Sequence, residues 1–191
     1  MKKIINLYFL ISALSCSVFA QELLPYKNSD LAEDVRVDDL LSRMTLVEKV
    51  GQMSQFVGPE HIALSEKHMS LEEMQAGDAY GMYPNLHSSQ IPKVIKEGKI
   101  GSFLHVTNPH EANRLQQYAS QSRLGIPLII GIDAIHGNGL VKGATIYPSP
   151  IGMASTWNLD LVRQSSVETA REVRLNGAHW AFSPNIDIAR D

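Results

Sequence analysis

Cysteine is almost absent from this sequence. The single cysteine, Cys16, lies close to the N-terminus, so residues 21–191 cannot form a disulfide among themselves. A domain without disulfides depends on its hydrophobic core for stability, and hydrophobic residues make up 44% of the chain. The composition therefore indicates a globular domain, and it excludes both a disulfide-stabilised scaffold and a disordered chain.

An excess of basic residues is also absent. The chain has 17 Lys and Arg residues against 20 Asp and Glu residues, which gives a formal net charge of −3 at pH 7. Because nucleic-acid binding depends on neutralising phosphates, this charge offers no basis for a nucleic-acid partner. Beyond the N-terminal segment, no apolar run approaches the roughly 20 residues of a transmembrane helix, so we expect no membrane span.

The N-terminal segment has a composition of its own. Lys2 and Lys3 precede an apolar stretch over residues 4–14, and mostly small residues follow up to Ala20. This layout is typical of a secretory signal peptide, so we expect cleavage after Ala20 and export, most simply to the periplasm. The rival interpretation is a lipoprotein attached through Cys16, although residues 13–15 make a poor lipoprotein box.

The chain after the predicted signal peptide alternates between helical and strand patterns. Residues 21–34 are polar and turn-rich and are interpreted as a tether, and "VDDLLSRMTLVEKVGQM" then predicts helix, with a capping box from Thr45 to Glu48. Residues 56–88 show no clear period and are interpreted as a surface excursion with one short helix near residues 70–76. Three strands are predicted, at residues 100–104, 127–132 and 178–182, separated by the helical segments "NPHEANRLQQYASQSRLG" and "NLDLVRQSSVETAREVRLNG".

The predicted strands are apolar on both faces. Strands of this kind, separated by helices, are typical of a parallel sheet that is covered on both sides. The fold class is therefore α/β. The pattern by itself fits either a barrel or a doubly wound sheet.

Two polar residues follow the second predicted strand. In parallel α/β folds the ligand lies beyond the carboxyl ends of the strands, and Asp133 stands at such an end. A carboxylate can accept hydrogen bonds from neighbouring hydroxyls of a polyol, and the alternative is an aspartate that caps the turn. His136 could be a base, a ligand or a residue that stabilises the turn.

Other chemistry is disfavoured by spacing. The histidines at 105, 110, 136 and 179 lack the tight spacing of a metal site, so we expect no metal and no cofactor. The stretch "GNGLVKG" looks like a phosphate-binding loop, but the proline-containing segment "IYPSP" follows it instead of a helix.

Four segments, in order, resemble a known family. They are "MTLVEKVGQM", "LGIPLIIGIDAIHG", "GATIYPSPIGMASTWNLDLV" and "AFSPNIDIARD", and together they are similar to the N-terminal domain of glycoside hydrolase family 3, nearest to its β-glucosidases and exo-β-glucanases. The resemblance covers most of residues 35–191. It implies that the chain is the N-terminal part of a TIM-type (β/α)8 barrel, truncated after the third βα unit.

The resemblance also implies a function. Asp133 matches the aspartate that hydrogen-bonds the hydroxyls of the terminal sugar, whereas His136 belongs to the same motif and is expected to support the loop. The substrate would be a β-linked oligosaccharide or glucoside, from which the complete enzyme removes terminal β-D-glucosyl residues by retaining double displacement.

Neither catalytic carboxylate of the family matches a residue of this chain. The nucleophile and the acid/base are expected beyond Asp191, so we assign no catalytic residue here and expect the chain alone to be inactive. The alternative is a short protein that binds sugar or a partner without hydrolysing it.

Overall fold

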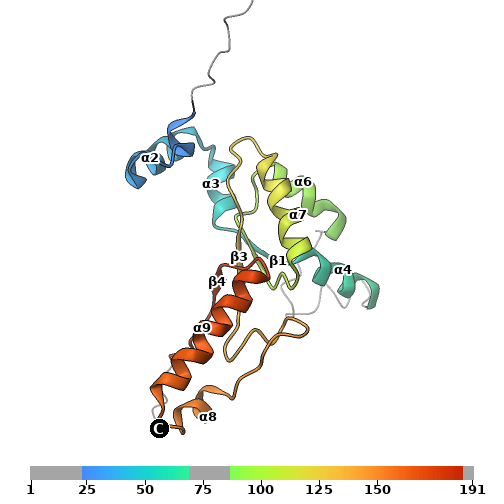
Figure 1. Cartoon of the computed structure of the whole chain (residues 1–191). Helices are drawn as coiled ribbons and strands as arrows, with labels where there is room; N and C mark the ends of the chain where they lie inside the picture. The colour runs from blue at the N-terminus through green and yellow to red at the C-terminus, as the bar shows by residue number, and fades with distance from the viewer. Residues whose placement is uncertain (1–22, 69–86, 187–191) are drawn as a thin grey trace, which may run out of the picture. The chain divides into compact units, whose positions relative to one another are not determined.

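The computed structural model describes residues 23–68 and 87–186 (Figure 1). The chain divides into two compact units, residues 1–43 and residues 44–191. In the first, the 3₁₀ helix η1 (Pro25–Lys27) packs against helix α2 (Glu33–Arg43). Tyr26 is buried there, and its backbone N–H donates to Oδ2 of Asp39 at 3.1 Å. Part of the predicted tether is therefore folded.

The second unit contains a parallel sheet and the helices that connect its strands. Its elements, in chain order, are α3 (Leu46–Gln52), β1 (Gln55–Val57), α4 (Pro59–His68), η2 (Ser88–Gln90), α6 (Ile91–Lys96), β2 (Ser102–Leu104), α7 (Pro109–Ser120), β3 (Ile129–Ile132), α8 (Pro150–Ala154), α9 (Leu159–Leu175) and β4 (Trp180–Ala181). None of the helices among the described residues is long and apolar enough to cross a membrane.

Side-chain caps begin three of the helices, and the one at α3 is the capping box that the sequence predicts. The Thr45 hydroxyl accepts a hydrogen bond from the Glu48 N–H at the start of α3, and the Glu48 carboxylate accepts one from the Thr45 N–H, which completes the capping box. Asn108 and Asn158 cap α7 and α9 in the same way.

The sheet has the strand order β1-β2-β3-β4, and every neighbouring pair is parallel. In a doubly wound sheet the strand order reverses at a switch point, whereas in a barrel each strand pairs with the next strand along the chain. The observed order is that of a barrel, and it resolves the choice that the hydrophobic pattern left open.

The prediction of an irregular excursion over residues 56–88 is wrong at its start. Gln55–Val57 forms a strand beside β2, and α4 follows it, so the described residues contain four strands instead of the three predicted. A strand of three residues, of which only Val57 is buried, is too short to show a period in the sequence. The helix predicted near residues 70–76 lies outside the described residues.

The core lies between the sheet and helices α6 and α7. Its fully buried side chains include Phe103 on β2, Ile130 and Ile132 on β3, Ile95 on α6 and Leu115 on α7. Figure 1 shows α6 and α7 together on this side of the sheet, and they pack directly on one another. The carboxyl ends of β2 and β3 are thereby held on a rigid support.

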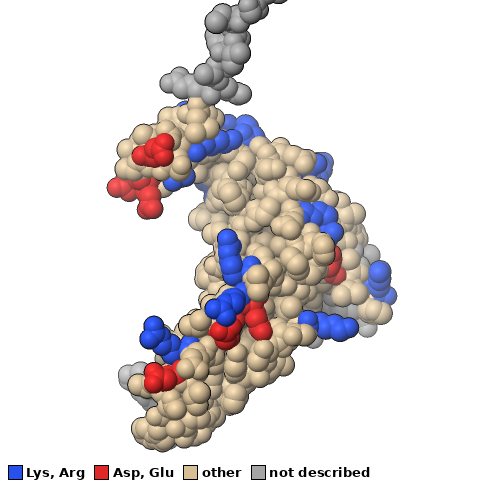
Figure 2. Space-filling model, viewed as in Figure 1, with Lys and Arg blue, Asp and Glu red and all other residues tan. Residues whose placement is uncertain are grey.

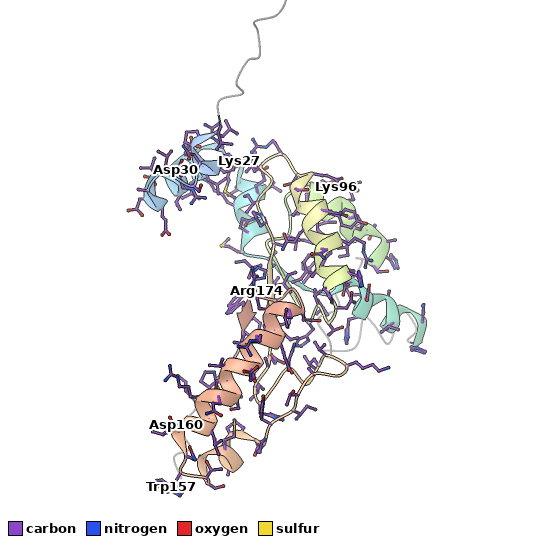
Figure 3. All side chains as sticks on the ribbon, in the orientation of Figure 1. Lys27, Asp30, Lys96, Trp157, Asp160 and Arg174 are labelled. Carbon is purple, nitrogen blue, oxygen red and sulfur yellow. The ribbon has the colours of Figure 1, made fainter. Side chains whose placement is uncertain are left out.

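Helix α9 is packed at one end only. Its predicted apolar face is buried at Val173, beside the sheet, whereas Leu159 is 84% exposed and Val167 is 49% exposed. In Figure 3 the labelled Arg174 lies near the strands, and Trp157 and Asp160 lie at the far end of the helix. At that end α8 (through Met153) contacts α9, and the Met153 Sδ accepts a hydrogen bond from the Ser165 hydroxyl, but Leu159 stays exposed.

A partly buried ion pair joins three elements at the amino edge of the sheet. Glu48 of α3 accepts hydrogen bonds from Nε and Nη2 of Arg123, at 3.0 and 2.5 Å, and Arg123 lies in the segment before β3. The Cγ atom of Glu48 also lies against Gly98, in the turn before β2, where a Cβ would come within 3.0 Å of it. The hydrogen bonds from Arg123 lower the pKa of the Glu48 carboxyl from 4.5 to about 2.

The pKa of a second buried glutamate is shifted in the opposite direction. Glu111, in the first turn of α7, is 1% exposed and accepts the backbone N–H of Glu60 at 2.7 Å. Arg114 pairs with Glu60 at 2.9 Å, and burial raises the pKa of the Glu111 carboxyl above its ordinary value. Burial therefore disfavours the ionised form of Glu111, whereas the hydrogen bonds from Arg123 favour the ionised form of Glu48.

We predict that Glu48→Gln lowers the free energy of unfolding by about 1–2 kcal/mol at pH 7, because it breaks the charged pair with Arg123. A carboxylate with a lowered pKa stabilises the fold above its unfolded pKa, and this contribution is lost as the pH falls from 4.5 toward 2. Thermal unfolding of the complete protein at pH 7 and pH 3 should show that the stability difference between wild type and variant is smaller at pH 3 than at pH 7. A smaller loss is expected for the control Glu97→Gln, which breaks an exposed pair with Lys99. A difference that stays constant with pH would contradict the assignment.

Candidate functional site

Asp133 and His105 meet at the carboxyl edge of the sheet. Each follows the end of a strand, Asp133 after β3 and His105 after β2, and the parallel register pairs Leu104 with Gly131. The backbone N–H of His105 donates to the carbonyl of Gly131 at 3.0 Å, and its Nε2 lies 3.1 Å from Oδ2 of Asp133. Two residues that are 28 positions apart in the sequence are thereby in direct contact.

The contact defines what each group can do. Because an ionised carboxylate only accepts hydrogen bonds, the imidazole donates from Nε2. The Asp133 side chain is 46% exposed and that of His105 is 27% exposed, so both are open to solvent. No other described residue makes a hydrogen bond to the Asp133 carboxylate. Its other oxygen is therefore available to accept hydrogen bonds from a ligand.

The backbone around this pair is strained. His105 has φ of 58° and Ala134 has φ of 45°, and both values lie in the left-handed region that residues with a Cβ seldom adopt. Asn138 is 1% exposed, and neither polar atom of its side chain has a hydrogen-bond partner among the described residues. Backbone strain and buried polar groups without partners are typical of functional sites, where a required arrangement of side chains is maintained although it lowers the stability of the fold.

His136 holds the loop that follows Asp133. Its Nδ1 lies 2.8 Å from the carbonyl oxygen of Tyr147, and the Tyr147 N–H donates to the His136 carbonyl at 2.8 Å. Gly137 forms an isolated antiparallel bridge with Ile146 between these contacts. These contacts close the loop across its base. A supporting role for His136 at a binding site stays a prediction, and the structure brings His105 rather than His136 to Asp133.

A cavity lies away from this site. It has a volume of about 540 Å³ and lies between α8, α9 and the residues that follow β3 and β4. His136 and Tyr147 line one part of it, but neither Asp133 nor His105 does. Its walls are mainly apolar, which suits packing better than the binding of a polyol.

The site has no metal-binding character in the part of the chain that the structure describes. No group of three His, Cys, Asp or Glu side chains there could hold an ion. On the face shown in Figure 2, basic and acidic side chains lie interspersed among larger areas of other residues. The chemistry at the sheet edge is therefore that of hydrogen bonding by a carboxylate and an imidazole.

His105 is not singled out by the sequence pattern, in which it is one of several scattered histidines. It nevertheless follows the apolar run at residues 100–104, just as Asp133 follows the next strand. The position of His105 directly after a predicted strand is the sequence feature that could have identified it. The fold and the site together define a parallel βα domain of the barrel type, with a partly exposed carboxylate beyond the carboxyl ends of its strands.

Comparison with known proteins identifies the family. Residues 45–191 match the model of the glycosyl hydrolase family 3 N-terminal domain, so the chain belongs to this family. It is 30% identical over 162 residues to the periplasmic β-glucosidase of Salmonella typhimurium, covering 84% of this chain and 17% of that protein. It is 32% identical over 178 residues to β-glucosidase C of Emericella nidulans, covering 87% of this chain and 26% of that protein. The chain spans about a sixth to a quarter of the length of these relatives.

Solved structures agree with this membership. A β-glucosidase involved in saponin metabolism from intestinal bacteria is 40% identical, with a TM-score of 0.52 over 78% of this chain and 16% of that one. An exo-1,3/1,4-β-glucanase from a Pseudoalteromonas species is 26% identical, with a TM-score of 0.55 over 79% of this chain and 22% of that one. The predicted fold class, α/β as the N-terminal part of a TIM-type barrel, is confirmed.

We predict that Gly137→Ala disrupts the loop after Asp133, because a Cβ at this position would lie 2.1 Å from the carbonyl oxygen of Thr145. Gly143→Ala is the matched control. Its φ of 87° also disfavours a Cβ, but no atom lies within 4 Å, so only conformational strain of roughly 1–2 kcal/mol is expected. Near-ultraviolet circular dichroism and thermal unfolding of the complete protein should separate the two variants. Equal losses in both would show that the close approach at Gly137 is unimportant.

Proposed function

We propose that this chain is the sugar-binding part of a β-glycoside hydrolase that removes terminal, non-reducing β-D-glucosyl residues. The observation that supports this proposal is the half-exposed carboxylate of Asp133. It lies at the carboxyl ends of the strands of a parallel sheet, and one of its oxygens contacts His105. Family membership supports the reaction class. A β-linked glycoside as substrate is supported by the names of the relatives, which are β-glucosidases and a β-glucosidase/β-xylosidase of Dickeya chrysanthemi.

Asp133 binds substrate in this proposal and does not attack it. Its free oxygen accepts hydrogen bonds from neighbouring hydroxyls of the sugar, and a carboxylate binds such a pair more strongly than a neutral acceptor does. The loop closed by His136 and Tyr147 forms the rim of the pocket. Retaining hydrolysis needs two further carboxyl groups roughly 5 Å apart, and we assign neither of them to a residue of this chain.

Asp133→Asn should reduce kcat/KM of the complete hydrolase on an aryl β-glucoside by roughly tenfold to more than a hundredfold, because a hydrogen bond to a charged acceptor is worth about 1.5–3 kcal/mol. The thermal midpoint should change little, since Asp133 is 46% exposed on its side chain. Steady-state kinetics on purified wild type and variant test this. Unchanged kinetics would leave Asp133 as a turn residue only.

We further propose that residues 1–20 are a signal peptide and that the mature protein begins at Gln21 in the periplasm. The names of two relatives, both periplasmic, support this location. Intact-mass measurement of the exported protein should give a start at Gln21. A lipidated species that begins at Cys16, or an uncleaved precursor, would refute the proposal.

Residues 21–191 expressed alone should be inactive and should self-associate. The apolar residues at the α8–α9 end are uncovered, with Ile151 84%, Trp157 93% and Leu159 84% exposed. In the strand order β1-β2-β3-β4 the strand at residues 100–104 is internal, and not at an edge as the predicted three-stranded order required, while β4 is the last strand among the described residues. Open strand edges and exposed apolar surface promote association between chains. Light scattering and assay of an aryl β-glucoside, with the complete protein as control, test both statements. A monodisperse monomer with activity would contradict them.

A further inference from the structure

We propose that His105 is a positioning residue for Asp133. Its imidazole donates from Nε2 to Oδ2 of the carboxylate and so directs the other oxygen toward the hydroxyls of the sugar. This inference rests on the proposed function, and it assigns a role to a residue that the sequence argument did not select.

The backbone of His105 is fixed before its side chain is considered. Its N–H donates to the carbonyl of Gly131 at 3.0 Å, which extends the β2–β3 ladder one residue beyond the end of β2. Directly there the chain turns into the left-handed region, with φ of 58° at His105. Glycine would adopt this conformation without strain, yet the position carries a histidine whose ring reaches the neighbouring strand end. The strained turn therefore places an imidazole where it contacts Asp133.

The carboxylate needs such a support. Asp133 is 46% exposed on its side chain, so packing does not fix its orientation, and the described residues offer it no hydrogen bond other than the one from His105. A carboxylate that rotates freely must be ordered each time a sugar binds. A carboxylate that is already held loses less freedom on binding, and this preorganisation favours the bound and transition states.

Three substitutions of His105 in the complete hydrolase test the role. In His105→Gln the side-chain amide nitrogen can occupy the place of Nε2 and donate to Asp133. In His105→Asn the amide is too short to do so, but asparagine tolerates a positive φ better than most residues. His105→Ala removes the donor altogether. His110→Gln, which changes an exposed histidine of α7, is the control.

We expect kcat/KM on an aryl β-glucoside to fall about tenfold in His105→Ala and His105→Asn, the effect of losing one hydrogen bond to a charged group. His105→Gln should keep most of the activity, and His110→Gln all of it. The thermal midpoint of His105→Asn should equal or exceed that of His105→Ala. A purely structural role for His105 would make activity follow stability, so an asparagine variant that is both stable and fully active would overturn the inference.

A double-mutant cycle with Asp133→Ala completes the test. If His105 acts through Asp133, His105→Ala should cost less than about twofold once the side-chain acceptor is gone, because the two changes remove the same interaction. The same tenfold loss in both backgrounds would overturn the inference while leaving the proposed function intact. Failure of the wild-type protein to hydrolyse any aryl β-glycoside would instead refute the proposed function itself.

Discussion

The parallel pairing of β2 with β3 is the interaction on which the candidate site depends. Its register places Phe103 against Ile130 and Leu104 against Gly131, and Phe103, Ile130 and Ile132 are fully buried in the core that α6 and α7 share with the sheet. A slip of one residue would expose these buried side chains, so the register is strongly specified. The same register brings His105 and the segment leading to Asp133 side by side at the carboxyl ends of the two strands.

The amino and carboxyl ends of the strands are built differently. At the amino edge, Glu48 joins α3, the turn before β2 and the segment before β3 through a bidentate contact with Arg123, and this ion pair favours the folded state at neutral pH. Beyond the carboxyl ends of the strands, positive φ angles at His105 and Ala134 lower stability instead, as does the Asn138 carboxamide, which has no hydrogen-bond partner among the described residues. This division is expected of a barrel, whose ligands bind at the carboxyl edge while the opposite edge contributes stability.

Several features could be predicted from the sequence because they have local causes. The capping box at Thr45 and Glu48 and the caps at Asn108 and Asn158 involve residues three apart on one turn. The strands β2 and β3 follow from their apolar runs, although the structure buries these runs only in part, since Ile129 is 47% exposed. The strand at Gln55–Val57 could not be predicted in this way, because three residues carry no period and it is defined only by its pairing with β2. The exposure of Leu159 on α9 depends on which elements lie beside the helix, and a helical pattern does not specify its neighbours.

The sequence by itself determined that a carboxylate follows a buried strand, and its ordered motifs indicated the family that the comparisons then showed. Asp133 could be selected because strand-end position is a local property of the chain. Only the tertiary structure decided what Asp133 touches. His105 is 28 residues away, and the pairing of two parallel strands, which is a long-range interaction, sets the 3.1 Å contact between their side chains. Hydrophobic pattern specifies which residues are buried in each strand, whereas strand order and register specify which polar residues meet beyond the strands' ends.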